Sequence, residues 1–396
     1  MKRYSILMTV AFLIISMGFI PSANAQTKTF TVGVLGPMSG SSAIWGLNLE
    51  HGLAIAIEEI NEAGGITVKG ERYLVKYIVG DHQARSADAT ILANKMIFKD
   101  NIKYIVGNCV GATCGGAQSV TEPNHVVFLH QCWGTKSIGP DKPYSFRTLV
   151  SQWEVAPQLY GWFHKKYPKI TSLAIMSPND TSGWDTTEAV KYAAEAYGLK
   201  IVVNEFYKRG STDYYPILSK IMATKPEIID LSGSAPGDGG LILKQLNELG
   251  YNGVKIWTAG DPPDNWIEIS GKKSGEGVYL GLAPNFEGAK AAVGLKNFAR
   301  KYHAKKYKEG ISIQSVVNYT GMKALAQAIE QAGTFDQDKV INVLENSKYQ
   351  TAFGRTVVGG KKKYGINRQF IWPVTISQVR DGKGVDVFRA AEVIAE

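Results

Sequence analysis

The chain has 396 residues, of which 44% are hydrophobic and 20% are charged, and its formal net charge is +9. This composition is typical of a soluble globular protein and contains no low-complexity region. The basic excess is spread along the chain apart from short Lys runs at 305–306 and 361–363. Because no nucleic-acid-binding motif accompanies these runs, we do not expect a nucleic-acid partner.

The first 25 residues have the pattern of a secretory signal peptide. Lys2 and Arg3 supply a positive start, an apolar run covers 6–20, and the small-residue site Ala-Asn-Ala occupies 23–25. The run is shorter than the roughly 20 apolar residues of a membrane span, so an uncleaved anchor is the weaker interpretation. No Cys follows the cleavage site near Ala25, so a lipid anchor is not expected. The predicted location is the periplasm.

About 370 residues remain after removal of that segment, which predicts two compact units rather than one. In the first unit, Leu49, Leu53 and Ile57 share one helix face, and Gly64-Gly65 ends the helix. A second helix is predicted over 87–98. The strands predicted in this unit cover residues 30–35, 73–79, 104–106 and 126–129.

The same alternation begins again after residue 148 and predicts a second unit of similar build. Its predicted strands cover 173–176, 201–206, 228–231, 255–257 and 278–282, and its helices cover 156–167, 185–197, a segment after 216, and 241–249. Three further helices are predicted over 291–307, 316–331 and 339–345, before a β-like tail around 370–379. Because these elements follow both units, we expect them to return to each, which gives several crossings and a hinge.

Several ordered motifs resemble a known family. The stretch TVGVLGPMSGSSAIWGLNLEHGLAIAIEEINEAGGI is similar to the opening of type I periplasmic binding proteins, the branched-chain amino-acid-binding group. Further matches follow in order: ILANKMIFKDNIKYIVG, NDTSGWDTTEAVKYAAEAYG, STDYYPILSKIMATKPEIIDLSG and LILKQLNELGYNGVKIW. The resemblance covers essentially the whole chain after the signal segment.

The resemblance implies an α/β fold of two Rossmann-like lobes with parallel-type central sheets, a three-segment hinge, and a ligand cleft between the lobes. We expect lobe 1 to comprise 26–148 plus 284–352, and lobe 2 to comprise 149–283 plus 353–396. It also implies a monomeric substrate-binding protein that delivers a small solute to the permease subunits of an ABC importer. Such a protein has no cofactor and no catalytic activity.

The resemblance places the ligand at loops that follow the carboxyl ends of strands, where open α/β sheets bind ligands. The residues expected to bind it are Trp45, Asn108, Gly111, Ala112, Thr113, Cys132, Trp133, Gly134, Ser182, Trp184, Ala235 and Asp261. Amino-acid-binding members place hydroxyl side chains where this chain has Gly111-Ala112 and Cys132-Trp133-Gly134.

These departures favour a ligand with an acidic end, held by backbone N–H groups at helix starts, and an apolar or aromatic body. Trp133 and Trp184 lie in loops of opposite lobes and are expected to sandwich that body. A plain aliphatic amino acid is the alternative ligand.

Several of these residues also have structural interpretations. Asn108 and Thr113 either contact the ligand or cap the following helix, and Asp261 is equally suited to a turn before Pro262-Pro263. The three cysteines, Cys109, Cys114 and Cys132, leave at least one thiol free. A Cys109–Cys132 disulfide is one interpretation, and buried free thiols are the favoured one. No Cys/His spacing predicts a metal site.

Two other classes of function compete with transport. A ligand sensor would use the same fold to report occupancy to a receptor. A secreted enzyme would need a catalytic set, and no nucleophile–His–acid arrangement or paired-carboxylate motif stands out. We therefore expect a binding protein rather than an enzyme.

Overall fold

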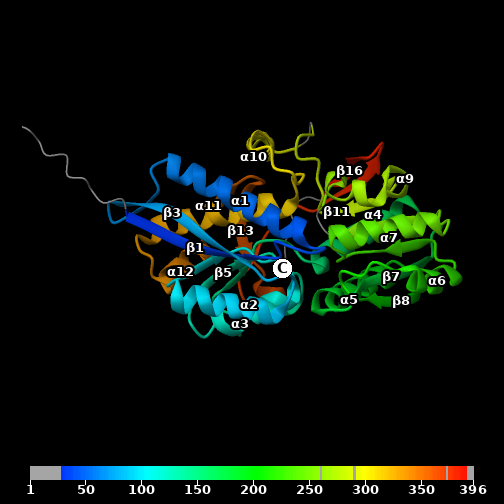
Figure 1. Cartoon of the computed structure of the whole chain (residues 1–396), viewed down its shortest axis with the longest axis horizontal. Coiled ribbons are helices and arrows are strands. Elements are labelled where there is room, and N and C mark those ends of the chain that lie inside the picture. The colour runs from blue at the N-terminus through cyan, green and yellow to red at the C-terminus, as the bar shows by residue number, and fades with distance from the viewer. Residues whose placement is uncertain (1–27, 259–260, 289–290, 372, 390–396) are drawn as a thin grey trace, which may run out of the picture.

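The computed structural model describes residues 28–258, 261–288, 291–371 and 373–389, so the predicted signal peptide and its cleavage site lie outside the described residues. Two lobes lie side by side along the long axis of the molecule (Figure 1). Each lobe is built on one sheet, and the expected α/β architecture with two mostly parallel sheets is confirmed. None of the described helices combines the length and apolarity needed to cross a bilayer.

The first lobe contains a nine-stranded sheet in the order β12-β13-β14-β6-β5-β4-β1-β3-β2. Its strands are β1 (Lys28–Gly36), β2 (Ile66–Val68), β3 (Glu71–Asp81), β4 (Tyr104–Val106), β5 (Val127–His130), β6 (Ser145–Arg147), β12 (Lys348–Thr351), β13 (Gly354–Gly359) and β14 (Gln369–Phe370). The central strands pair in parallel, from β3 through β1, β4 and β5 to β6. The apolar residues of β1, β4, β5 and β6 are buried on both faces, as in sheets that helices cover on both sides.

Two layers of helices cover this sheet. The helices are α1 (Ala43–Glu62), α2 (Ser86–Asn94), α3 (Gly111–Thr121), α10 (Val293–Ala304), α11 (Ile313–Ala332), α12 (Gln337–Asn346) and the short α13 (Lys361–Tyr364). In Figure 1, α1 and α11 lie on one face and α2 and α3 on the other. The predicted helix face of Leu49, Leu53 and Ile57 is buried, which confirms that α1 packs as its periodicity indicates.

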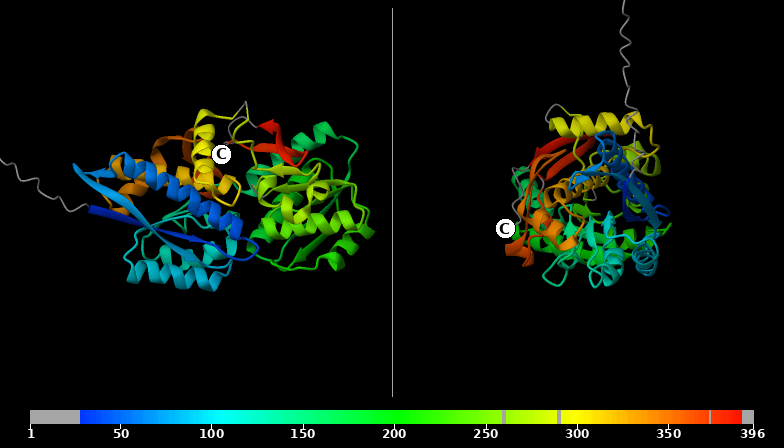
Figure 2. Two further views of the ribbon diagram at one scale, coloured as in Figure 1. Left: turned by 45° about the horizontal axis from the view of Figure 1, so that its top comes forward. Right: turned by 90° about the vertical axis from the view of Figure 1, so that its left-hand side faces the viewer.

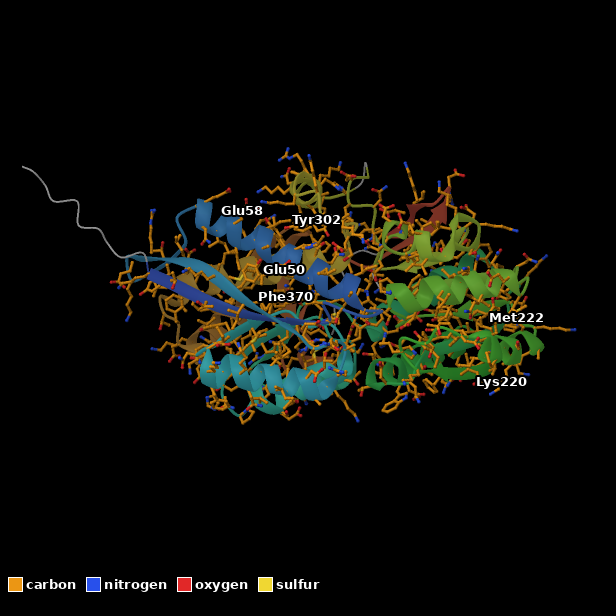
Figure 3. All side chains as sticks on the ribbon, in the orientation of Figure 1. Glu50, Glu58, Lys220, Met222, Tyr302 and Phe370 are labelled. Atoms are coloured by element: carbon orange, nitrogen blue, oxygen red, sulfur yellow. A yellow bond between two sulfur atoms is a disulfide. The ribbon has the colours of Figure 1, made fainter. Side chains whose placement is uncertain are left out.

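Helix α10 packs over α1 through polar as well as apolar contacts. The Tyr302 hydroxyl donates to Oδ1 of Asn48 at 3.1 Å and lies 3.1 Å from Nδ1 of His51. Figure 3 labels Tyr302 close to α1, where Glu50 and Glu58 are also marked. These contacts tie a helix that follows the second lobe in sequence back onto the first lobe.

The second lobe contains a seven-stranded sheet in the order β16-β15-β11-β10-β9-β7-β8. Its strands are β7 (Ser172–Pro178), β8 (Lys200–Tyr207), β9 (Ile228–Asp230), β10 (Val254–Thr258), β11 (Tyr279–Gly281), β15 (Thr375–Arg380) and β16 (Lys383–Arg389). Its helices are α4 (Gln152–Lys166), α5 (Thr181–Ala196), α6 (Tyr215–Ala223), α7 (Pro236–Glu248), α8 (Ile267–Ser270) and α9 (Lys272–Gly275). A capping box of Ser151 and Glu154 begins α4 directly after the first crossing.

The chain passes between the lobes where it changes sheet, between β6 and β7, between β11 and β12, and between β14 and β15. Residues 354–359 and 369–370 form β13 and β14 of the nine-stranded sheet, so the assignment of 353–370 to the second lobe does not fit the structure. Figure 2 shows the red strands β15 and β16 in the second lobe, apart from the orange segments that precede them.

The contact between α1 and α11 depends on a glycine. A Cβ atom at Gly52 would lie 1.9 Å from the backbone oxygen of Ser315 in α11. The Gly52→Ala variant must therefore separate the two helices, and we expect the free energy of unfolding to fall by about 1–3 kcal/mol. Urea denaturation followed by circular dichroism measures this change.

Gly115 provides the matched control, because it is exposed in α3 and a Cβ there would have no neighbour within 4 Å. The Gly115→Ala variant is expected to be more stable than the wild type by about 0.5–1 kcal/mol, since alanine is the better helix former. Equal stability of Gly52→Ala and the wild type would contradict the close helix packing.

Candidate functional site

Residues from both lobes line a cavity between them. It lies at the carboxyl ends of the strands, since its lining residues follow β1, β4 and β5 in the first lobe and β7, β8 and β9 in the second. The residues that line it are Trp45, Cys109, Gln131, Trp133, Leu149, Ser182, Arg209, Gly233 and Gln314. This is the position at which open α/β sheets bind ligands.

Two indole rings supply most of the apolar wall. Trp45 lies in the first turn of α1 and Trp133 in the loop after β5, and both are buried, at 7% and 8% exposed. Although α1 belongs to the first lobe, Trp45 packs within the apolar cluster of the second lobe, which also contains Leu231 and Ala235. Trp45 therefore fixes the lobes against each other as well as lining the cavity.

The indole of Trp45 donates a hydrogen bond from Nε1 to the Asp261 carboxylate in the loop after β10. Asp261 is 3% exposed. Burial raises the pKa of the Asp261 carboxyl to about 7, and the bond from Trp45 only partly opposes that rise. The contact between the lobes is thus formed by a carboxyl group whose protonation changes near neutral pH.

Arg209 brings a positive charge to the cavity from the loop after β8. Its Nε donates to Oδ2 of Asp180 at 2.9 Å, and its Nη2 lies 2.8 Å from the same oxygen. Asp238 is 3.9 Å from Nη1, and the guanidinium lies 5.9 Å from the centre of the Trp45 ring. Burial by itself would lower the pKa of Arg209, but Asp180, followed by Tyr207 and Asp238, raises it above its ordinary value, so the group stays charged.

Further hydrogen bonds join the lobes around the cavity. The backbone N–H of Gly111, at the start of α3, donates to Oγ of Ser182 at 2.8 Å. The Thr135 hydroxyl donates to Asp185 at 3.0 Å. On the other side, the N–H of Gly237 donates to the backbone oxygen of Ser41 at 3.3 Å. The lobes are thus held together over a cavity that both of them line.

The family model for periplasmic binding proteins matches residues 29–383, which is most of the chain. The chain belongs to this family. The fold and the expected resemblance agree with that assignment, and members of the family are solute-binding proteins rather than enzymes, which confirms the expected absence of catalysis. A periplasmic location also follows from membership of this family.

A curated relative of this periplasmic binding protein is Leu/Ile/Val-binding protein homolog 8 of Brucella suis, 27% identical over 96% of each chain. Among solved structures, the leucine-binding protein LivK of Thermotoga maritima matches with a TM-score of 0.80 and 21% identity over 92% of this chain and 99% of its own. A solute-binding protein of an ABC transporter from Rhodopseudomonas palustris, in complex with 3,4-dihydroxybenzoic acid, matches with a TM-score of 0.79 and 22% identity over 92% and 98%. At these identities the structures establish the fold.

Of the residues expected to bind ligand, Trp45, Trp133 and Ser182 line the cavity. Gly111 and Asp261 lie at its margin, through their bonds to Ser182 and Trp45. The remaining expected residues are not among those that line it: Asn108, Ala112, Thr113, Cys132, Gly134, Trp184 and Ala235.

Local bonding explains several of these differences. Thr113 donates to Oδ1 of Asn108 at 2.7 Å, and the same oxygen lies 3.0 Å from Nε2 of His82, so these two oxygens are used within the protein. Nδ2 of Asn108 has no hydrogen-bond partner among the described residues. Trp184 is 51% exposed, and its Nε1 donates to Asn179. The pair expected to face each other across the cavity, Trp133 and Trp184, is therefore not formed, and Trp45 is the second tryptophan of the wall.

Sequence reasoning also missed lining residues. Arg209 stands in the segment Lys-Arg-Gly, which has the composition of an exposed turn, and Gln314 belongs to a helix that follows the second lobe. Leu149 lies at the first crossing. The one available signal for Arg209 was its position directly after a predicted strand, in a loop that opens onto the ligand edge of the sheet.

The cysteines differ from expectation as well. Cys114 and Cys132 form a disulfide, which joins α3 to the loop that carries Trp133, while Cys109 is the free thiol. The pairing considered between Cys109 and Cys132 is therefore wrong, and the favoured free thiol is confirmed for Cys109 but wrong for Cys132. His130 brings a third potential metal ligand within 4.8 Å of these two sulfurs, but the sulfurs are bonded to each other and do not act as thiolate ligands.

The disulfide generates a stability prediction. It closes a short loop, with a sequence separation of 18 between its cysteines, so the Cys114→Ser, Cys132→Ser double variant should lose about 2–4 kcal/mol of unfolding free energy. Thermal and urea unfolding measure the loss. Cys109→Ala is the control, because it removes a thiol and no crosslink, and it should cost clearly less. A double variant as stable as this control would contradict the crosslink.

Proposed function

We propose that this protein is the substrate-binding component of an ABC importer and captures a small organic carboxylate with an apolar or aromatic body. The observation that carries the proposal is the pairing of one guanidinium with two indole rings in a cavity lined by both lobes. Arg209 supplies the charge, and Trp45 and Trp133 supply the apolar wall. Because members of this family bind solutes, we assign the cavity to binding rather than to catalysis.

The hydrogen bonds of Arg209 support recognition of an anion. Nε donates to Asp180, and Nη1 donates to the Gly233 oxygen at 3.5 Å, the outer limit of a hydrogen bond. Nη2 lies 2.8 Å from the Asp180 carboxylate but is buried without a hydrogen-bond partner among the described residues. A guanidinium has five N–H groups in a planar fork that matches a carboxylate. A ligand carboxylate that accepts from Nη2 completes the set, and the ion pair with Asp180 holds the guanidinium in place for it.

The indole rings favour a flat body beside that charge. Trp45 and Trp133 are both nearly fully buried, and Leu149 adds to the apolar wall. Rings of this size bury large apolar areas and stack on aromatic ligands. The structurally similar protein from R. palustris is described in complex with 3,4-dihydroxybenzoic acid, and an aromatic acid of that kind suits the groups present here.

Capture by hinge closure follows from the distribution of the contacts. A ligand shifts the balance between open and closed lobes only if it binds the closed form more tightly, which requires contacts to both lobes. Trp133 and Arg209 provide one contact from each lobe. Three chain crossings allow the lobes to rotate, and the closed monomer then docks on the permease subunits. Docking, the monomeric state and cleavage of residues 1–25 are parts of the same proposal.

The test is a calorimetric titration of the mature protein, stripped of bound ligand by partial unfolding, against aromatic acids, short aliphatic acids and aliphatic amino acids. We expect an aromatic acid to bind best. Arg209→Lys should weaken it by roughly tenfold or more, because lysine does not reproduce the planar fork. Lys208→Met is the control, because Lys208 is exposed. This variant removes a positive charge, and it should leave the affinity unchanged.

The two tryptophans separate the proposal from its alternatives. Trp133→Ala should lower the affinity for the aromatic acid, whereas Trp184→Ala, on the exposed surface, should not. Binding of aliphatic amino acids alone would overturn the carboxylate proposal and restore amino-acid uptake. A stable complex with a receptor in place of a permease would restore the sensing role.

Asp261 makes ligand affinity depend on pH. Its pKa is about 7 when buried beneath Trp45, against an ordinary value near 3.8 when the lobes part and water reaches it. Asp261 therefore takes up a proton on closure when the pH lies between 3.8 and about 7. Ligand affinity is then highest at low pH and falls as the pH rises through 7. Titrations should give roughly tenfold tighter binding at pH 6 than at pH 8. The Asp261→Asn variant should be flat over this range, and a wild-type affinity independent of pH would contradict the coupling.

A further inference from the structure

Gln131 uses only part of its hydrogen-bonding capacity within the protein. It lies in the loop after β5, is 1% exposed and lines the cavity. Its Nε2 donates to the backbone oxygen of Gln314, in the first turn of α11, at 2.9 Å. Because a carbonyl oxygen accepts only from the nitrogen of the amide, this bond fixes the orientation of the side chain and leaves Oε1 on the other side.

Within the described part of the chain, no donor reaches Oε1 of Gln131, although the atom is buried. The other first-lobe residues around the cavity are mainly apolar, including Cys109, Trp133 and Leu149. A buried acceptor without a donor is unfavourable, and such groups are rare in folded proteins unless a ligand or water satisfies them. The cavity therefore has an acceptor in its first-lobe wall and a cation, Arg209, in its second-lobe wall.

We propose that Gln131 is a specificity-determining residue, whose Oε1 accepts a hydrogen bond from a hydroxyl group on the body of the ligand. This inference rests on the proposed function, because the carboxylate at Arg209 fixes which end of the ligand meets Gln131. The substrate class is then a hydroxy-substituted aromatic carboxylate rather than an unsubstituted one.

The charges around the cavity favour a neutral donor over an ammonium group. Asp180 and Asp238, the acids nearest the guanidinium, are engaged with Arg209, and Asp261 is engaged with Trp45. Gln131 itself is uncharged, so an ammonium group at that end would be buried without a counter-charge, at a high desolvation cost. A phenolic hydroxyl needs only the one acceptor that Oε1 offers.

The experiment compares hydroxybenzoates with fluorobenzoates by isothermal titration calorimetry on the mature wild-type protein. Fluorine is close to a hydroxyl in size but donates no hydrogen bond, so 3- and 4-hydroxybenzoate are matched with 3- and 4-fluorobenzoate. We expect one hydroxybenzoate to bind at least about tenfold more tightly than its fluoro counterpart. Equal affinities within both pairs would overturn this inference and leave the proposed function standing.

The Gln131→Met variant tests whether Gln131 causes the preference for hydroxybenzoate over fluorobenzoate. It keeps the length of the side chain and removes the acceptor. If Oε1 binds the hydroxyl, the ratio of the two dissociation constants should fall to nearly one. A residue that merely shapes the loop would weaken both ligands equally, so an unchanged ratio overturns the inference. If no aromatic carboxylate binds the wild-type protein, the proposed function fails first, which is a distinguishable result.

Discussion

The carboxyl ends of the parallel strands in both sheets open onto the same gap, and this arrangement places the groups of the cavity. Strands that connect through right-handed helical crossovers release all their following loops at one edge of the sheet. Two such edges turned toward each other bring Trp133 and Arg209 into one cavity. Neither lobe alone supplies both an apolar wall and a cation, so the cavity has its chemistry only when the lobes meet.

Buried charges hold the junction at which the chain leaves the first lobe. Arg147 is fully buried at the end of β6 and lies 3.7 Å from Glu154 of α4, which in turn pairs with Lys363 at 3.0 Å. Arg147 also donates to the backbone oxygen of Gly134 at 2.9 Å, beside Trp133. Paired buried charges specify a geometry more than they add stability. Here that geometry links the hinge to the loop that carries a tryptophan of the cavity.

Closure and recognition share the same side chains. Trp45 lines the cavity, and the Arg209 guanidinium lies over its ring. The Nε1 of Trp45 donates a hydrogen bond to Asp261 of the opposite lobe. A group that bridges the lobes and also touches the ligand position couples ligand contact directly to the closed state. Because these groups are buried together, their charges interact more strongly than they would in water. The raised pKa of the Asp261 carboxyl is one consequence of that burial.

The βα alternation, the family and most strand-end loops can be predicted from the sequence, because periodicity and ordered motifs are properties of neighbouring residues. Which side chains enter the cavity depends instead on how distant segments pack. Ser182 and Trp184 are two residues apart in α5, and about 100° per residue turns the second away from the cavity that the first lines. Likewise, the pairing of β14 with β6 and the approach of Arg209 to Trp45 join segments distant in the chain, and such contacts leave no local pattern.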